Sequence, residues 1–272
     1  MTQTPDQPWY QSAFGAHYPL LYQHRNDAEA RQCLNLLPQL APLGDRPGVP
    51  LLDLGCGDGR HLQWLAAAGH EVVGLDLSAH LLALAKERHS EPPVPLLRGD
   101  MRKLPCKNDS MAAVLSLFTA FGYFGPPAAN GEPVAEIARV LQRGAHWFLD
   151  YFDGDRVLAE LGDGRDHVRE RELACLRIME TRRYHADRRQ VVKEVVLSPL
   201  SGCETEAAQY GIGSVGLRYC EQVAVFTLAE LDELAQKQGL LRVAAAGSYD
   251  GLPLGQGPRW ILVYRKEHDH TG

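Results

Sequence analysis

Three glycines at alternate positions, with an acid two residues ahead of the first, form the most chemically informative pattern in this sequence. Asp53 precedes Gly55, Gly57 and Gly59, and the pattern overlaps the end of an apolar run over residues 49–54. Glycine has no Cβ, so these positions can adopt positive φ and let the backbone approach a ligand closely. The apolar run is typical of a buried parallel strand, and the residues after the loop have helical spacing. The pattern predicts a ligand-binding turn between strand and helix, with an ordinary glycine-rich turn as the alternative.

The spacing of the glycines separates two classes of nucleotide cofactor. A nicotinamide dinucleotide favours G-x-G-x-x-G, but Arg60 stands three residues after Gly57 and Leu62 three residues after Gly59. Asp76 follows a second apolar strand, seventeen residues after Gly59. An acid at about this distance accepts hydrogen bonds from a ribose diol, so it is expected for either class. The glycine spacing disfavours a nicotinamide, and the acid favours a nucleoside.

Three segments together resemble class I S-adenosylmethionine-dependent methyltransferases. The glycine loop is similar to the first motif of that family, and residues 99–105, Gly-Asp-Met-Arg-Lys-Leu-Pro, are similar to a later one. Residues 117–124, Leu-Phe-Thr-Ala-Phe-Gly-Tyr-Phe, resemble a stretch in a poorly characterised bacterial subgroup of small-molecule methyltransferases. Two places depart from the family: Met111 and Ala112 replace a frequent Phe-Asp pair, and Gly144-Ala145 replaces a glycine pair. The resemblance extends from about residue 18 to residue 266.

The resemblance implies S-adenosylmethionine as cofactor and S-adenosylhomocysteine as product. It implies that the glycine loop faces the methionine end, that Asp100 accepts from the adenine amino group, and that the backbone of Met101 reaches the ring edge. For the cofactor carboxylate the resemblance suggests Tyr18, Tyr22 or Arg25. The planar fork of Arg25 is the best geometric match. Packing of Tyr18 onto the core and solvation of Arg25 are the alternatives. The implied cofactor-binding residues are Asp53, Gly55, Cys56, Gly57, Gly59, Asp76, Leu77, Asp100, Met101, Leu117, Tyr22 and Arg25.

Aromatic residues follow the fourth apolar strand, where the resemblance places the transferable methyl group. Aromatic faces favour cations by about 0.5 to 2 kcal/mol each, so they suit a sulfonium or an amine. Two polar residues, Asp150 and Tyr151, emerge where the fifth strand ends, and capping or solvating the loop is their alternative role. The candidate substrate residues are Tyr18, Phe118, Phe121, Tyr123, Asp150 and Tyr151, with core packing as the alternative for each aromatic. No residue is assigned as catalytic, and no metal is expected.

The elements that position these residues predict an α/β fold: a Rossmann-like seven-stranded mixed sheet with an antiparallel β insertion. Residues 1–47 are expected to form an N-terminal aromatic and helical lid, residues 48–155 and 227–267 the core, residues 156–226 the insertion over the active site, and residues 268–272 a polar tail. Within the insertion, alternation predicts strands near 175–184, 190–197 and 218–226. A helix over 132–141 is expected to stop at Arg143-Gly144. Arginines around the first insertion turn, at 182, 183, 188 and 189, indicate charged strand edges more than a nucleic-acid surface.

Composition narrows the class of partner. The chain has 272 residues and a net charge of −6, which disfavours a nucleic-acid substrate because phosphate backbones need a basic face. No apolar stretch approaches the roughly 20 residues of a membrane helix, and the first fifteen residues lack a signal-peptide pattern. Six scattered cysteines are typical of reduced thiols in the cytoplasm. Exposed insertion strands allow a homodimer.

The expected function is transfer of a methyl group to a small-molecule acceptor, for which an amine fits the aromatic and acidic lining best. A protein that binds S-adenosylmethionine without catalysis is one alternative. An RNA methyltransferase and a nicotinamide-dependent oxidoreductase are others, disfavoured by the charge balance and by the glycine spacing.

Overall fold

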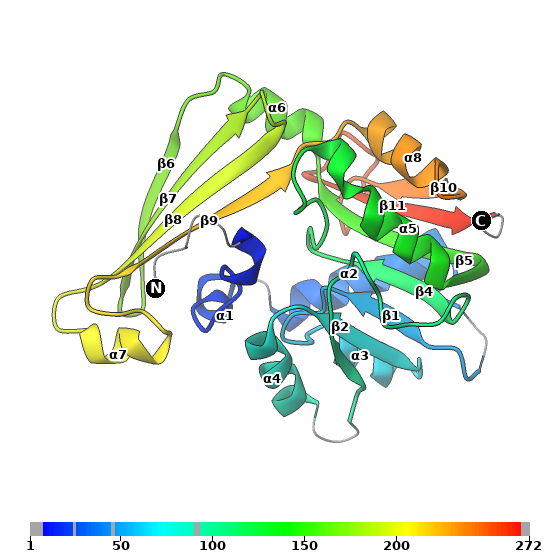
Figure 1. Ribbon diagram of the computed structural model, residues 1–272, viewed down its shortest axis with the longest axis horizontal. Coiled ribbons are helices and arrows are strands. Elements are labelled where there is room, and N and C mark those ends of the chain that lie inside the picture. Colours follow the sequence, from blue (N-terminus) through cyan, green and yellow to red (C-terminus); the bar gives the residue numbers. More distant parts are fainter. Residues whose placement is uncertain (1–7, 24–25, 45–46, 90–92, 268–272) are drawn as a thin grey trace.

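The computed structural model describes residues 8–23, 26–44, 47–89 and 93–267, and its larger sheet confirms the predicted fold class. Seven strands lie in the order β10-β11-β5-β4-β1-β2-β3 (Figure 1). Strand β11 pairs antiparallel with β10 and with β5, and the other pairs are parallel. The strands are β1 (Leu51–Leu54), β2 (Val72–Asp76), β3 (Leu96–Arg98), β4 (Met111–Ser116), β5 (Leu141–Phe152), β10 (Leu240–Ala246) and β11 (Arg259–Lys266).

The strand order reverses at β1, and this reversal positions the site. From β1 the chain continues to β2 and β3 on one side, then returns to β4 on the other side of β1. The loops after β1 and β4 therefore lead away from each other and leave a crevice between them. Ligands of open α/β sheets bind at such switch points, beyond the carboxyl ends of the strands.

Helices cover both faces of this sheet. One apolar cluster joins the strands to α5 (Gly131–Val140) and α8 (Leu228–Gln236). A second apolar cluster is formed by the strand residues that point to the other face of the sheet. It joins the strands to α2 (Asp27–Leu40) and α3 (Leu62–Ala67). The remaining core elements are α4 (Ala79–Arg88), the 3-10 helix η2 (Pro127–Asn130) and α6 (Gly154–Leu161). The core is thus a three-layered arrangement, as expected for a parallel sheet buried on both faces.

The predicted end of the helix between the fourth and fifth strands, at Arg143-Gly144, is wrong. Helix α5 ends at Val140, and β5 begins directly at Leu141. Gly144 lies inside β5 with φ +78°. The register jumps there, because Met111 pairs with Leu141 whereas Ala113 pairs with His146. The glycine therefore allows a bulge in a strand, rather than the end of a helix.

The insertion forms a separate antiparallel sheet with the strand order β6-β7-β8-β9. Its strands are β6 (His167–Leu173), β7 (Leu176–His185), β8 (Gln190–Pro199) and β9 (Leu217–Ala224), and α7 (Glu204–Gln209) lies between the last two. The sequence analysis predicted three of these strands and missed β6, whose residues are mostly charged and exposed. The interpretation of the arginines as strand edges is wrong for Arg182 and Arg183, because β7 is an interior strand. Arg183 instead forms an ion pair with Asp166.

The N-terminal segment packs against the insertion. It contains η1 (Trp9–Gln11) and α1 (Tyr18–Leu21), which lie between the four-stranded sheet and the core (Figure 1). A third apolar cluster unites Trp9 and Leu21 with Ile178, Val195 and Tyr219 of the sheet. The sheet therefore supports this segment from behind. In the described part of the chain, no helix is long and apolar enough to cross a membrane.

Candidate functional site

A cavity of about 770 Å³ opens at the switch point of the larger sheet. Its walls come from the glycine loop after β1, the ends of β2, β3 and β4, the start of α2, and the N-terminal segment. Among the described residues that line it, none belongs to the insertion at 156–226. The insertion, which was expected to lie over the active site, packs against the N-terminal segment that lines the cavity.

The glycine loop adopts the backbone that its sequence predicted. Gly55, Gly57 and Gly59 have φ of +80°, +57° and +77°. The amide of Gly55 donates to Leu75 O at 2.8 Å, which fixes the loop against β2. A Cβ on Gly55 would stand 2.7 Å from the Cβ of Ala120. Gly55, Cys56 and Gly57 line the cavity, whereas Gly59 faces α4 and is absent from the wall.

Asp76 ends β2 at the cavity wall, as predicted. Its carboxylate accepts from the amides of Gly57 at 2.9 Å and Ser78 at 2.8 Å. Burial raises the pKa of Asp76 from its ordinary value, and these backbone donors oppose the rise. Ser78 caps α4 by accepting from Leu81 N, and its hydroxyl also donates to Phe14 O at 2.8 Å. This second bond ties the N-terminal segment to the edge of the site.

Asp100 and Met101 line the opposite end of the cavity. The carboxylate of Asp100 accepts from Arg102 Nη2 at 2.7 Å and from the Arg102 amide at 2.9 Å. Hydrogen bonds from Arg102 hold the pKa of Asp100 below its ordinary value. The Arg102 guanidinium lies 4.7 Å from the centre of the Phe124 ring. Asp100 therefore stays an ionised acceptor at this end of the cavity.

Asp53 lies beneath the glycine loop and is 1% exposed, so it is not part of the described cavity wall. Its Oδ2 has no hydrogen-bond partner among the described residues and lies 4.0 Å from His61 Nδ1. Burial raises the pKa of Asp53 to about 7, against the effect of Arg60. His61 lines the cavity, and burial lowers the pKa of its imidazole well below the ordinary value. The sequence analysis missed His61, although a polar residue directly after a glycine loop was a usable signal.

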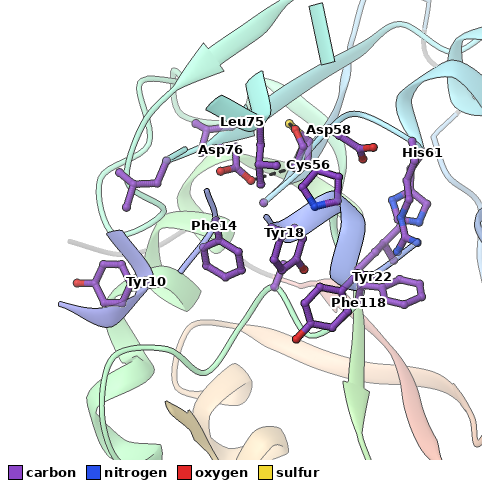
Figure 2. A pocket seen from close by; sticks show the side chains of 18 of the residues that line it. Tyr10, Phe14, Tyr18, Tyr22, Cys56, Asp58, His61, Leu75, Asp76 and Phe118 are labelled. Atoms are coloured by element: carbon purple, nitrogen blue, oxygen red, sulfur yellow. Dashed lines mark hydrogen bonds between the residues drawn. The ribbon is translucent and has the colours of Figure 1, made fainter. Parts of the chain in front are cut away.

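The N-terminal segment forms an aromatic wall. Figure 2 shows Tyr10, Phe14, Tyr18 and Tyr22 in a row along one side of the cavity, across from Asp76. The sequence analysis named Tyr18 and Tyr22 as site residues but not the other two, although all four recur at a spacing of four residues. Within this wall the ring centres of Phe14 and Tyr18 are 5.0 Å apart, and those of Tyr18 and Tyr22 are 4.6 Å apart.

The hydroxyl of Tyr22 is held by the insertion. It donates to Glu221 at 2.7 Å and contacts Lys193 Nζ. Lys193 also lies 3.1 Å from Glu221 and 3.5 Å from Glu180, although it is buried. The hydroxyl therefore already has protein partners, which makes it a poor match for the cofactor carboxylate suggested by the resemblance. Arg25, the other candidate, lies outside the described residues.

The candidate substrate residues divide into two groups. Tyr18, Phe118 and Tyr123 line the cavity, together with the cofactor candidates Leu77 and Leu117. The other three are absent from the described wall, and all are fully or almost fully buried. Phe121 packs on Trp147 and Phe226, and the hydroxyl of Tyr151 donates to Ala224 O at 2.6 Å. The carboxylate of Asp150 accepts hydrogen bonds from the Phe118 amide and from Arg259 Nε. For these three, a substrate-contacting role does not agree with the structure.

No group of three His, Cys, Asp or Glu side chains in the described residues could hold a metal ion. Cys56 is buried in the glycine loop, and burial raises the pKa of its thiol well above the ordinary value. It therefore acts as a small packing residue at neutral pH rather than as a thiolate nucleophile.

Comparisons with known proteins agree with this geometry. Residues 51–144 match a family model described as a methyltransferase domain. The chain is 31% identical over 163 residues to dTDP-3-amino-3,4,6-trideoxy-alpha-D-glucopyranose N,N-dimethyltransferase of Streptomyces venezuelae, covering 56% of this chain and 66% of that relative. It is 32% identical over 130 residues to phthiotriol/phenolphthiotriol dimycocerosates methyltransferase of Mycobacterium leprae, covering 47% of this chain and 46% of that relative.

The chain thus spans less than two thirds of the length of these curated relatives. Among solved structures, the CcbJ methyltransferase from Streptomyces caelestis matches with a TM-score of 0.72 and 18% identity, covering 95% of this chain and 99% of that one. At this identity the match shows a shared fold, including the insertion and the N-terminal segment within its coverage.

Proposed function

Because this chain carries a class I S-adenosylmethionine-dependent methyltransferase domain, we propose that it transfers a methyl group from that cofactor to the amine of a small molecule. The observation that carries the proposal is the cavity itself. Its glycine loop and its acids at the ends of β2 and β3 suit a nucleoside cofactor, and an aromatic wall stands opposite. The amino-sugar N,N-dimethyltransferase of Streptomyces venezuelae supports an amine as acceptor.

The residues present fit the cofactor. Asp76 and Asp100 offer carboxylate oxygens at two separate parts of the wall, which suits the ribose hydroxyls and the adenine amino group. Asp53 Oδ2 is buried without a hydrogen-bond partner in the described chain. A buried acceptor left unsatisfied costs about 1 to 3 kcal/mol, but Asp53 lies beneath the loop and outside the described wall, so it is not counted among the ligand contacts. The positive φ of Gly55 and Gly57 keeps side chains out of the space that the methionine end would need.

S-adenosylmethionine, when bound, supplies a methyl group already activated on a sulfonium. The chain's residues then have to hold the acceptor nitrogen in line with that methyl, at about 3 to 3.5 Å, and exclude water. Tyr18 and Tyr123 suit this role, because they line the cavity and their ring faces attract an ammonium group. Phe118 also lines the cavity, but its ring centre already lies 3.7 Å from the Arg60 guanidinium carbon, so it shapes the wall. The nitrogen attacks as a neutral amine, so an ammonium acceptor first releases a proton to solvent. A carbon–nitrogen bond then forms as the carbon–sulfur bond breaks, and the methylated ammonium product carries the positive charge that the sulfonium loses.

Turnover with a panel of acceptors tests the proposal. The purified chain is incubated with S-adenosylmethionine and with matched small amines, alcohols and carboxylic acids. S-adenosylhomocysteine and the methylated product are then measured by mass spectrometry. Product from amines is the expected result, whereas product only from alcohols or acids would contradict the amine. Binding of the cofactor by calorimetry with no product across the panel would favour a cofactor-binding protein without catalysis. Binding of a nicotinamide dinucleotide, with no response to S-adenosylmethionine, would favour an oxidoreductase.

We further propose that the protein works in the cytoplasm, which its six free cysteines support.

We also propose that strand β6 pairs two copies of the chain into a homodimer. Strand β6 is an edge of the smaller sheet, and most of its residues are exposed. Exposed edge strands invite pairing with another chain. Light scattering after size exclusion would give a dimeric mass, and a monomeric mass at working concentration would exclude the dimer.

A further inference from the structure

The structure assigns Asp150 and Arg259 to the positioning of Phe118: this buried ion pair holds the turn after β4 so that the Phe118 ring forms the cavity wall beside the transferred methyl group. The assignment rests on the proposed function for the nature of the ligand. It replaces the direct substrate contact that the sequence suggested for Asp150. Phe118 lines the cavity, whereas Asp150 is 0% exposed and Arg259 is outside the described wall.

The turn after β4 has an unfavourable backbone. Strand β4 ends at Ser116, and then Phe118 and Thr119 both have φ of +60°. Neither residue is glycine, asparagine or aspartate, the types that tolerate the left-handed region. Strain of this kind persists only where the surroundings fix the conformation, and it gathers at functional sites. The contacts that fix this turn should therefore be visible.

They converge on Asp150, in β5. Its Oδ2 accepts from the Phe118 amide at 2.8 Å and from the Tyr249 hydroxyl at 2.6 Å. Its backbone oxygen accepts from the Thr119 amide at 2.9 Å. Arg259, at the start of β11, donates to Asp150 Oδ1 through Nε and to Thr119 Oγ1 through Nη2, the latter at 3.0 Å. Both strained residues are thus bonded to the same buried pair.

The charges around the pair are consistent with this role. Burial and the neighbouring Asp150 raise the pKa of the Tyr249 phenol, so it remains a donor at neutral pH. The carboxylate then faces three donors: one amide, one phenol and one guanidinium. A carboxylate accepts at both oxygens, whereas an amide in its place would turn an N–H₂ toward at least one of these donors. The arrangement therefore requires the charged acid.

The strained turn determines where the Phe118 ring lies. Its centre lies 3.7 Å from the Arg60 guanidinium carbon and 5.3 Å from that of Arg259. The His61 ring centre is 6.1 Å away, and Figure 2 shows Phe118 and His61 at the same end of the cavity. A ring held among these groups has one position. If the turn relaxes to negative φ, the ring leaves that position, and a displacement of about 1 Å in a methyl-transfer site can cost about 100-fold in rate.

The alternative explanation is that the Asp150–Arg259 pair contributes only to the overall stability of the protein. A substitution elsewhere on β11 gives a matched control for this alternative. At the other end of the same strand, the buried Lys266 donates to Asp109 at 2.6 Å and to Leu141 O at 2.8 Å. Lys266→Met removes the ion pair between the buried Lys266 and the half-exposed Asp109, at the end of β11 away from Arg259 and Phe118. Asp150→Asn keeps the shape of the side chain and removes the charge. Both variants are expected to lower the melting temperature.

Two measurements separate the roles. Amide hydrogen exchange at Phe118 and Thr119 should accelerate at least about tenfold in Asp150→Asn and stay unchanged in Lys266→Met. At equal distance below the melting temperature of each protein, kcat should fall about 10- to 100-fold in Asp150→Asn and stay within about twofold in Lys266→Met. Unchanged exchange, or equal kcat in the two variants, would overturn the assignment.

The exchange measurement needs no substrate, so it decides the positioning role even if the proposed methyl transfer proves wrong. If Asp150→Asn does not fold, Arg259→Lys replaces it. A lysine keeps the charge but cannot bond Asp150 Oδ1 and Thr119 Oγ1 together, and accelerated exchange at Thr119 with folded protein is then the expected result. Exchange as slow as in the unmodified chain would again overturn the assignment.

Discussion

Replacing Gly55 with alanine is the sharpest test of the glycine loop. The new Cβ would sit on a backbone with φ +80°, a conformation that costs an L-residue about 1 to 2 kcal/mol. It would also stand 2.7 Å from the Cβ of Ala120, closer than real Cβ contacts allow. Overpacking of this kind costs about 1 to 3 kcal/mol. The two effects together amount to about 2 to 5 kcal/mol.

Gly69 supplies a matched control for the first of these effects. Its φ is +88°, and a Cβ there would meet nothing within 4 Å. Gly69 also lies outside the described cavity wall. Gly69→Ala should therefore lose about 1 to 2 kcal/mol of stability and bind ligand like the unmodified chain. The difference between the two variants isolates the collision with Ala120.

Calorimetric titration with S-adenosylhomocysteine, combined with thermal unfolding, measures both quantities. Relief of the collision requires the loop or Ala120 to move, and both line the cavity. If the whole free-energy cost falls on binding, the affinity of Gly55→Ala for S-adenosylhomocysteine drops between about 30-fold and about 4,000-fold, at about 1.4 kcal/mol for each factor of ten. A folded Gly55→Ala protein that binds within threefold of the unmodified chain would refute the role given to the loop.

Three further outcomes follow from the site and its supports. Tyr22→Phe should lower stability by about 1.5 to 3 kcal/mol, because the hydrogen bond to the Glu221 side chain is lost, yet change S-adenosylhomocysteine affinity less than threefold; a large loss of affinity would show that the hydroxyl contacts the ligand. Asp76→Asn should weaken the same affinity about 10- to 100-fold in calorimetry, and a loss under threefold would show that the carboxylate does not contact the ribose. Hydrogen bonds from Arg189 hold the pKa of Glu230 at about 2, below its ordinary value of 4.5. A depressed pKa stabilises the folded state above the unfolded value, so the advantage of the unmodified chain over Glu230→Gln should be full above pH 4.5 and vanish as pH falls toward 2. Urea midpoints at pH 7, 4 and 3 measure this, and a constant difference would contradict it.

Local patterns predicted the backbone of the glycine loop and the place of Asp76 and Asp100 at the cavity. The glycine spacing required positive φ, and the apolar runs placed Asp76 and Asp100 at the ends of strands on one edge of the sheet. Each of these inferences needed only residues adjacent in sequence and the rule that parallel strands end together. Gly144 shows the limit of such reasoning, because a glycine after a helical pattern is equally suited to a cap and to a strand bulge.

The other half of the site depends on contacts that span most of the chain. The fifth strand was expected to end at Asp150 on the ligand edge, so this residue was interpreted as a ligand contact; β5 in fact continues to Phe152. Its actual partners, Tyr249 and Arg259, stand 99 and 109 residues away in sequence. The same holds for Tyr22, whose partners Glu221 and Lys193 lie in the four-stranded sheet. No sequence pattern near the N-terminus predicts these contacts. Pairings of this kind become visible only when the two sheets are placed.

The bond between Tyr22 and Glu221 also sets an order of events during synthesis. It joins residues 199 positions apart, so the first segment made must wait for β9 before it finds its support. A ribosome adding about 5 to 20 residues per second needs roughly 10 to 40 seconds for that length. During this interval the glycine loop can fold with the early strands, while the aromatic wall has no sheet behind it. The nascent chain can therefore form its glycine loop early, and the aromatic wall that closes the cavity becomes ordered later.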